Sequence, residues 1–223
     1  MEVRVLDHFK LSNAVIAART CWNSFHKGGN YREPTDDISE ADKELLQRLL
    51  FKERHTSISE HIYYCFNIQD ITRFVLVELS RHRIASYSVE STRYTLKRLK
   101  YEKSFIIYNR DKPGYVYDIE RASEFIEINP EVNTNFQVQQ LEFVREVLLD
   151  GASIDDVKYL LPENYLTDLV WTINVRSLRN FLQLRLSKSA HKAIRSLAKA
   201  VYEAIPAEHK FLFEDIANEN SNV

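Results

Sequence analysis

The chain has 223 residues, of which 44% are hydrophobic and 28% are charged, with a formal net charge of −2 and only 4 Gly and 5 Pro. These values favour one soluble globular domain with a full core and without long flexible linkers. They argue against general nucleic-acid binding, which requires a strongly basic domain, and no apolar run approaches the roughly 20 residues that span a bilayer.

The first part of the chain is expected to form a strand over residues 3–8 and a helix over residues 13–21. A second helix is predicted over residues 39–54. There Ser39 precedes Asp42 by three positions, as at a capped helix start. Leucines follow at helical spacing, at positions 45, 46, 49 and 50.

Residues 60–69 alternate between apolar and polar side chains, which predicts a strand. Its apolar side consists of Ile62, Tyr64, Phe66 and Ile68. We expect Asp70 to cap a helix over residues 71–83, so that the basic residues 81–83 lie at its C-terminal end. A further strand is predicted over residues 103–109.

In the second half, Asn129 and Pro130 are expected to open a long helix that runs through Leu149 and stops at Gly151. A short helix, a strand and two helices are then predicted over residues 153–160, 166–174, 176–186 and 190–205. The mixture of strands and helices favours an α/β (α+β) fold, with a mixed sheet and flanking helices in a single domain over residues 1–223.

The most unusual segment is ELSRHRIASYSVESTRY, residues 78–94. From Arg81 to Lys103 the chain has seven Lys or Arg residues against two Glu. The helix dipole favours a cation or two at a helix C-terminus, but it does not account for the continuation. The hydroxyls, the backbone N–H groups and Arg93 together favour a pocket for a small anion such as a phosphate.

The cysteines and histidines indicate no disulfide and no metal centre. Cys21 and Cys65 form neither a CxxC pair nor a disulfide pattern, and the N-terminus lacks the layout of a signal peptide. A cytoplasmic location is therefore expected. His55 and His61 are six positions apart, which is not the spacing of a helical ligand pair, and no metal ligands are predicted.

Three blocks in order resemble the flavin-dependent thymidylate synthase family. RHRIASYSVES contains Arg-His-Arg, seven residues and then Ser, and the pair Arg93-Tyr94 follows, as in that family. Upstream, RHTSISEHIYYCF is similar to the family's His-x-Thr/Ser-x-x-Glu-His block. Downstream, LLPENYLTDLVWTINVRSLRNFLQLR is similar to its Leu-Pro, Trp-Thr-x-Asn-x-Arg-Ser-Leu and Asn-Phe-Leu-x-Leu-Arg run.

The resemblance implies a specific reaction. The methylene group of methylenetetrahydrofolate is transferred to dUMP and reduced with hydride from FAD, and NADPH restores the reduced flavin. The product is dTMP. The resemblance also implies a homotetramer whose sites are shared between subunits. Clustered arginines suit these ligands, because FAD and dUMP carry phosphates and folate carries carboxylates.

The resemblance also assigns residues. The positions expected to contact the flavin are Ser57, Arg81, His82, Arg83, Asn174, Arg176 and Asn180. Those expected to contact dUMP are Glu78, Arg81, Glu90, Ser91, Thr92, Arg93, Lys158 and Arg185, of which Arg185 is the catalytic residue that faces the uracil ring. His55 matches a histidine that lines the site.

Several of these residues have a simpler structural interpretation. Asn174 would also serve as a helix cap, and Ser57 as a turn hydroxyl. Arg185 would also serve as a cation at a helix end. His61 would equally suit the core or the site.

Four positions depart from the family pattern. Ser88-Val89 stands where Asn-Glu is common, so that a carboxylate near the ligands is missing or is supplied differently. Glu78 stands where Gln is common, and Lys158 replaces an Arg, although it still offers a phosphate a point charge. The segment AHKAIR also diverges.

A nucleotide-responsive or RNA-binding module without chemistry is the competing hypothesis. Tyr87, Tyr94 and Tyr101 would stack on bases while arginines hold phosphates. Such a module would carry no chromophore. A different flavoprotein reductase would keep the flavin but would not respond to dUMP.

Overall fold

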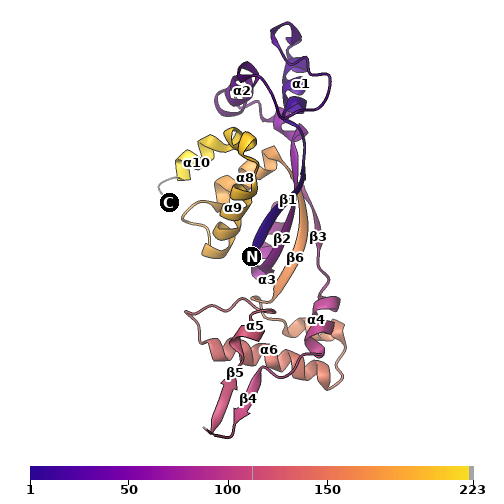
Figure 1. The fold of residues 1–223 in the computed structure, drawn as a ribbon, viewed down its shortest axis with the longest axis vertical. Helices are drawn as coiled ribbons and strands as arrows, with labels where there is room; N and C mark the ends of the chain where they lie inside the picture. Colours follow the sequence, from indigo (N-terminus) through magenta and orange to yellow (C-terminus); the bar gives the residue numbers. More distant parts are fainter. Residues whose placement is uncertain (112, 221–223) are drawn as a thin grey trace. The chain divides into compact units, whose positions relative to one another are not determined.

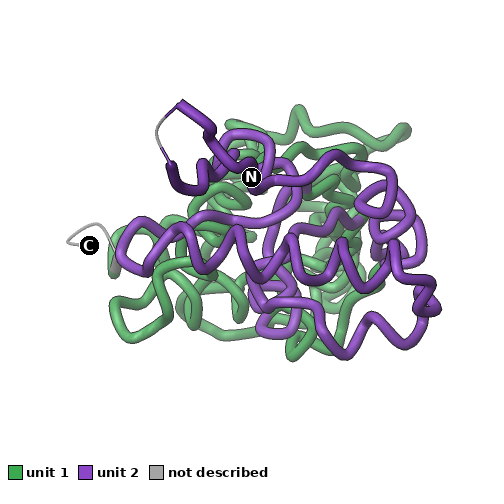
Figure 2. The backbone as a smooth tube through the Cα atoms, turned by 90° about the horizontal axis from the view of Figure 1, so that it is seen from below, with its two compact units in different colours: residues 1–68, 79–88, 170–223 green, residues 69–78, 89–169 purple. Residues whose placement is uncertain are grey.

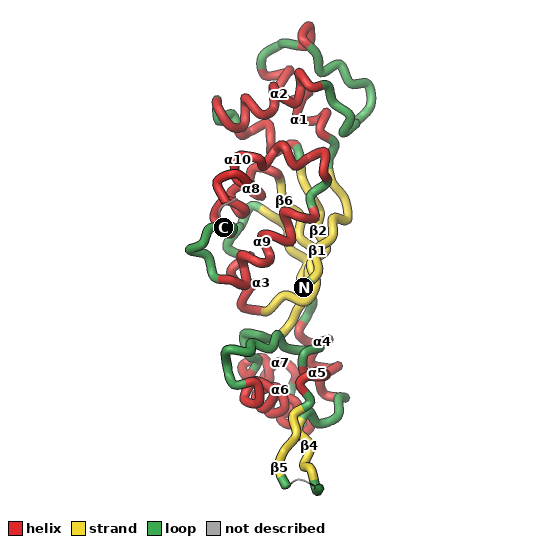
Figure 3. The backbone as a smooth tube through the Cα atoms, turned by 60° about the vertical axis from the view of Figure 1, so that its left-hand side comes forward, coloured by secondary structure: helices red, strands yellow, loops and turns green. Residues whose placement is uncertain are grey.

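A computed structural model describes residues 1–111 and 113–220. The strands are β1 (Glu2–His8), β2 (Tyr63–Thr72), β3 (Ala85–Val89), β4 (Ile106–Asn109), β5 (Gly114–Tyr117) and β6 (Leu166–Asn174) (Figure 1). The α-helices are α1 (Leu11–Cys21), α2 (Glu40–Gln47), α3 (Arg73–Ser80), α4 (Thr92–Lys100), α5 (Ile119–Ala122), α6 (Thr134–Leu149), α7 (Ile154–Val157), α8 (Val175–Arg185), α9 (Lys192–Ala204) and α10 (Glu214–Asn220). Shorter 3₁₀ turns cover Phe25–Lys27, Thr56–His61, Lys158–Leu160 and Ala207–Phe213, and Arg48–Lys52 is π-helical. The predicted α/β class is confirmed, as strands and helices alternate along the chain (Figure 3).

The backbone forms two compact units, coloured separately in Figure 2. The first unit consists of residues 1–68, 79–88 and 170–223, and the second of residues 69–78 and 89–169. The chain passes from one unit to the other within β2, α3, β3 and β6. Among the described helices, none is long and apolar enough to cross a membrane.

Four strands form a sheet in the order β1-β2-β6-β3. The two inner strands bury alternate side chains, as expected for strands with one face on a core. Ile62, Tyr64, Phe66 and Ile68 are almost fully buried, which confirms the predicted apolar side of β2. In the first unit, α9 packs against both β1 and α8 (Figure 1).

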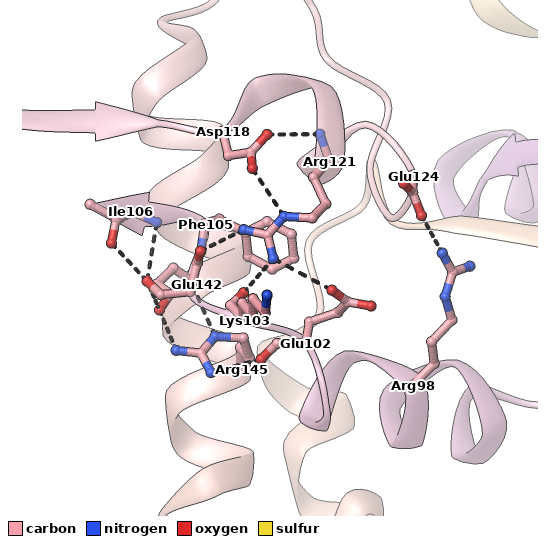
Figure 4. Close-up of polar contacts among 11 residues, drawn as sticks. Arg98, Glu102, Lys103, Phe105, Ile106, Asp118, Arg121, Glu124, Glu142 and Arg145 are labelled. Carbon is pink, nitrogen blue, oxygen red and sulfur yellow. Dashed lines mark hydrogen bonds and ion pairs between the residues drawn. The ribbon is translucent and has the colours of Figure 1, made fainter. Parts of the chain in front are cut away.

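The second unit is organised around α6, which contacts α4, α5, α7 and the antiparallel β4–β5 hairpin (Figure 3). Its core consists mainly of Leu96, Leu99, Phe105, Phe125, Val138, Leu141, Val144, Leu148 and Tyr165. A buried ion pair also joins Glu142 to Arg145 on α6 (Figure 4). The same carboxylate accepts hydrogen bonds from the Ser104 hydroxyl and the Phe105 N–H, and thereby attaches α6 to the start of β4.

Side-chain caps confirm two predicted helix starts. The Ser39 hydroxyl accepts from the Asp42 N–H at the start of α2, and the Ser153 hydroxyl accepts from the Asp156 N–H at the start of α7. After α6, Gly151 has φ +98°, a conformation that favours glycine, so the predicted stop is also confirmed.

Two predicted helix starts are wrong. Asp70 lies within β2 with φ +56°, and the Thr72 hydroxyl accepts from the Val75 N–H at the start of α3 instead. The strand continues past Asp70 because Ile71 and Thr72 are both buried.

The long helix begins at Thr134 rather than near Pro130, because the Asn133 side chain caps it through the N–H groups of Asn135 and Phe136.

Several elements were not predicted. They are β3, α4, β5, α5 and α10, which are short or, like α4, strongly charged. In addition, α3 ends at Ser80, so Arg81–Arg83 lie in the turn that follows it, and residues 85–89 form the strand β3.

Candidate active site

A cavity of about 750 Å³ lies in the first unit, which is within the range of small-molecule sites. It is lined by Glu60, Arg81, His82, Arg83, Ile84, Asn174, Arg176, Ser177, Asn180, Leu184 and Arg185. Four arginines against one glutamate give it an excess of positive charge that suits an anionic ligand. We call it the arginine cavity.

Helix α8 supplies one wall of this cavity. The Asn174 side chain accepts a hydrogen bond of 2.9 Å from the Ser177 N–H, so it caps the helix and lines the cavity at once. Ser177, Asn180 and Leu184 share a face because they are three or four residues apart. The opposite face is held by Leu178, Phe181 and Leu182, which are all fully buried.

The turn after α3 supplies the facing side chains. The His82 N–H donates to the Leu79 carbonyl at 3.0 Å, and the Tyr87 hydroxyl reaches the carbonyls of Leu79 and His82 at 2.9 and 2.7 Å. The His82 ring packs edge-on against Phe181, with centroids 5.0 Å apart. Because His82 is anchored in this way, Arg81 and Arg83 on either side of it are exposed at the cavity.

Arg185 connects these two walls at the last turn of α8. Its Nε donates to His82 Nε2 at 3.2 Å, so in this arrangement the imidazole nitrogen accepts and carries no proton. Arg185 is half-buried, unlike the exposed Arg81 and Arg83. Its guanidinium is therefore held in a defined orientation within the arginine cavity.

The sequence interpretation missed part of the lining. Glu60 lies 2.5 Å from Arg176 Nη1 and brings a carboxylate into the cavity. Glu60 is the Glu of the upstream block RHTSISEH, and its place in that block could have identified it as a residue of the site. Leu184 and Ile84 are exposed apolar side chains, and Leu184 was recognisable from its helical spacing to Asn180.

The structure brings together Arg81, His82, Arg83, Asn174, Arg176, Asn180 and Arg185. Ser57 is exposed on the same 3₁₀ turn as Glu60 but does not line the arginine cavity. His55 is exposed and stacks on Trp22, with ring centroids 5.2 Å apart. His61 is exposed, so the core interpretation of this histidine is wrong.

The remaining predicted positions belong to the second unit. Arg93 donates two hydrogen bonds to Asp155, at 3.0 and 2.8 Å, and Lys158 donates a third at 2.6 Å. Hydrogen bonds from Arg93 and then from Lys158 lower the pKa of Asp155 to about 2. Arg93 and Lys158, both predicted to bind substrate, therefore contact the same carboxylate. The sequence analysis did not identify Asp155, although its position three residues before Lys158 is typical of a side-chain pair on one helical turn.

The neighbours of Arg93 in the sequence have local roles. The Ser91 hydroxyl accepts from the Arg93 N–H at 3.4 Å and caps α4, and Thr92 is its first residue. The Glu90 N–H donates to the Asp168 carbonyl at 2.8 Å. Burial, followed by the nearby Asp168, raises the pKa of the Glu90 carboxyl. Glu78 is half-buried on α3, and Ser88 and Val89 are exposed on β3.

Comparison with known proteins agrees with this geometry. A family model described as thymidylate synthase complementing protein matches residues 4–209. The flavin-dependent thymidylate synthase of Wolinella succinogenes is 48% identical over 214 residues, which cover 96% of this chain and 97% of that protein. That of Campylobacter jejuni is 47% identical over 216 residues, or 96% of each chain.

A solved structure is similar over almost its whole length. The crystal structure of thymidylate synthase X from Helicobacter pylori with FAD and dUMP has a TM-score of 0.85 at 43% identity, covering 97% of this chain and 98% of that one. The resemblance of the three sequence blocks is thereby confirmed, and the chain belongs to the flavin-dependent thymidylate synthase family.

Proposed function

We propose that the protein converts dUMP to dTMP by reductive methylation, with methylenetetrahydrofolate as carbon donor, FAD as hydride carrier and NADPH as reductant. The observation that carries this proposal is the arginine cavity, which gathers seven of the family-matched residues from two distant parts of the chain. We also infer that the protein acts as a cytoplasmic homotetramer with sites shared between subunits, and that residues 1–223 are one catalytic domain. Its ligands are dUMP, folate and NADPH, without nucleic acid or membrane as partners.

The donor set of the arginine cavity fits FAD. Guanidinium groups of Arg81, Arg83 and Arg176 suit a pyrophosphate, amides of Asn174 and Asn180 suit a ring edge, and exposed Ile84 and Leu184 offer apolar contact to a flat ring. His82 and, from the neighbouring 3₁₀ turn, Ser57 complete the proposed flavin contacts. When bound, FAD supplies the redox chemistry, and the protein supplies orientation and charge.

For dUMP we propose two groups of contacts. Ser91, Thr92, Arg93 and Lys158, with Glu78, Glu90 and Arg81, bind the nucleotide, and Arg185 faces the uracil ring. An arriving phosphate would take over the hydrogen bonds that Arg93 and Lys158 now donate to Asp155. Asp155 would thus keep both cations ordered before substrate binds.

The residue with a chemical role is Arg185. Without an enzyme nucleophile, uracil has to be polarised before its C5 attacks the methylene carbon, and negative charge builds on its N3/O4 side during that activation. A guanidinium held against His82 stabilises that charge in the transition state more than in the ground state.

One assay tests the overall function. NADPH oxidation should depend on both dUMP and methylenetetrahydrofolate, and dTMP should appear in equal amount. A purified protein without flavin absorbance would favour the nucleic-acid-binding alternative, and a flavoprotein that oxidises NADPH without responding to dUMP would favour another reductase.

Removal of one cavity arginine is expected to weaken flavin binding. Arg81→Ala or Arg83→Ala removes a charge-assisted contact worth roughly 1.5–3 kcal/mol, so FAD affinity should fall about tenfold or more. Both side chains are exposed, so the unfolding midpoint should change little. Flavin content after gel filtration measures the effect, with Arg32→Ala, an exposed arginine outside the cavity, as matched control. Full flavin occupancy in both variants would contradict the assignment.

Loss of both cysteines is expected to leave dTMP formation intact. A nucleophilic cysteine needs an activated thiolate, usually beside cations. Cys21 is exposed at the end of α1 and Cys65 is half-buried in β2, and of the described residues that line the arginine cavity none is a cysteine. The Cys21→Ser/Cys65→Ser variant should therefore still turn over. A folded, flavin-loaded double variant without any dTMP product would refute this.

A further inference from the structure

A second cluster of ligand-type side chains lies in the first unit, among residues that the arginine cavity does not use. His8, at the end of β1, Asp36, in the loop before α2, and His209, in the 3₁₀ turn Ala207–Phe213, place their nearest ligand atoms within 4.8 Å of one another. His209 Nε2 lies 3.0 Å from Asp36 Oδ1, and His8 Nδ1 lies 4.0 Å from Asp36 Oδ2. His209 is fully buried, whereas the His8 side chain is 20% exposed.

An outer layer of hydrogen bonds orients two of these side chains. The Tyr64 hydroxyl lies 2.7 Å from His209 Nδ1, which turns Nε2 toward Asp36. The Leu11 N–H donates to Asp36 Oδ1 at 3.0 Å and holds the carboxylate in place. Metal-binding histidines are oriented in this way, with the second ring nitrogen bonded to a neighbouring group.

We propose that His8, Asp36 and His209 form a binding site for a divalent transition metal such as Zn²⁺. Two imidazoles and a carboxylate are a ligand set that such ions prefer, whereas Mg²⁺ and Ca²⁺ prefer oxygen alone. Bonds of about 2.0–2.2 Å place ligand atoms roughly 3–4 Å apart, so only a small movement of His8 is required. To bind the metal, His209 Nε2 would give up the proton that it shares with Asp36. That proton would pass to Nδ1, which would then donate to the Tyr64 hydroxyl oxygen, and water would fill the fourth position.

Lys10 is the residue that regulates this site. Its ammonium lies 2.7 Å from Asp36 Oδ2, so it competes with a metal ion for this carboxylate. Lys10 is 44% exposed, so it is able to move into solvent when a metal binds. A bound metal would then attach the end of β1 to the C-terminal 3₁₀ turn, because the three ligands come from segments far apart in the chain.

The test uses the full-length, flavin-loaded protein without a histidine tag, dialysed to equilibrium against Zn²⁺, with bound metal measured by mass spectrometry. We expect one equivalent per chain. His8→Ala should weaken binding by at least about tenfold, the scale of losing a metal-orienting group. Lys10→Met should tighten it about tenfold, because it removes a charge-assisted competitor for Asp36.

The controls separate this site from adventitious binding. His26→Ala removes an exposed histidine outside the cluster and should leave the affinity unchanged. Flavin content and circular dichroism show whether each variant is folded. Absence of bound Zn²⁺ in both the wild type and Lys10→Met, or binding that His8→Ala does not reduce, would overturn the proposal.

Discussion

Replacement of Arg185 by alanine is expected to lower dTMP formation by on the order of 10²-fold or more, the scale of losing one preorganised donor at a developing charge. The Nε–H of Arg185 donates a hydrogen bond to His82, and the side chain is half-buried. Both features hold the guanidinium in the arginine cavity. The measurement is single-turnover dTMP formation from pre-reduced enzyme at saturating dUMP, which excludes effects on substrate binding and flavin reduction.

Two further variants define what Arg185 does. Arg185→Lys should recover little, because a point charge reproduces neither the planar fork nor the bond to His82. Gln183→Ala, an exposed change on the same helix outside the cavity, should keep the wild-type rate. A near-wild-type rate for Arg185→Ala would leave this residue a structural cation at the end of α8.

Replacement of Glu142 by alanine is expected to destabilise the protein by about 3–5 kcal/mol, the scale of breaking a buried ion pair. Glu142 and Arg145 are 4% and 8% exposed, so the variant leaves a guanidinium buried without its carboxylate. It also removes the acceptor of the Ser104 hydroxyl and the Phe105 N–H. Urea unfolding at neutral pH measures the change.

The matched control for Glu142 is Glu146→Ala, an exposed change one turn further along α6, which should cost little. The double variant Glu142→Ala/Arg145→Ala should be less destabilised than Glu142→Ala, because no unpaired charge remains. Equal stability of Glu142→Ala and Glu146→Ala would show that the pair contributes nothing.

Because of the Glu142–Arg145 ion pair, we expect the free energy of unfolding to decrease at acidic pH. Burial alone would raise the pKa of the Glu142 carboxyl, but hydrogen bonds from Arg145, Phe105 and Ser104 outweigh it and lower the pKa below its ordinary value. The unfolded state therefore binds the proton first as pH falls. The stabilising contribution is complete above the ordinary Glu pKa of about 4.3 and is lost as pH falls through the lower folded value.

Local pattern predicted most elements but not their limits. The alternation of β2, the serine cap of α2 and the helix α8 depend on short-range features, and they are confirmed. The helix starts predicted from Asp70 and Pro130 are wrong. A residue caps a helix only where the preceding strand or turn ends, and the local sequence does not show where that is. Burial of Ile71 and Thr72, which no local pattern reveals, keeps Asp70 within its strand.

The sequence by itself determined which residue types are available for the site, because the three blocks, within residues 55–94 and 157–185, resemble one family in the same order. It predicted that Arg81, His82, Arg83, Asn180 and Arg185 act together, and the structure places them around one cavity.

Only the tertiary structure decided which groups neutralise or orient one another. Glu60 and Arg176 are 116 positions apart, Arg93 and Asp155 are 62 apart, and Asp36 and His209 are 173 apart. Such pairs form because packing of distant elements brings them within a few ångströms, and sequence spacing carries no information about that distance. The partners of the predicted arginines, and the cluster around Asp36, therefore became visible only in the fold.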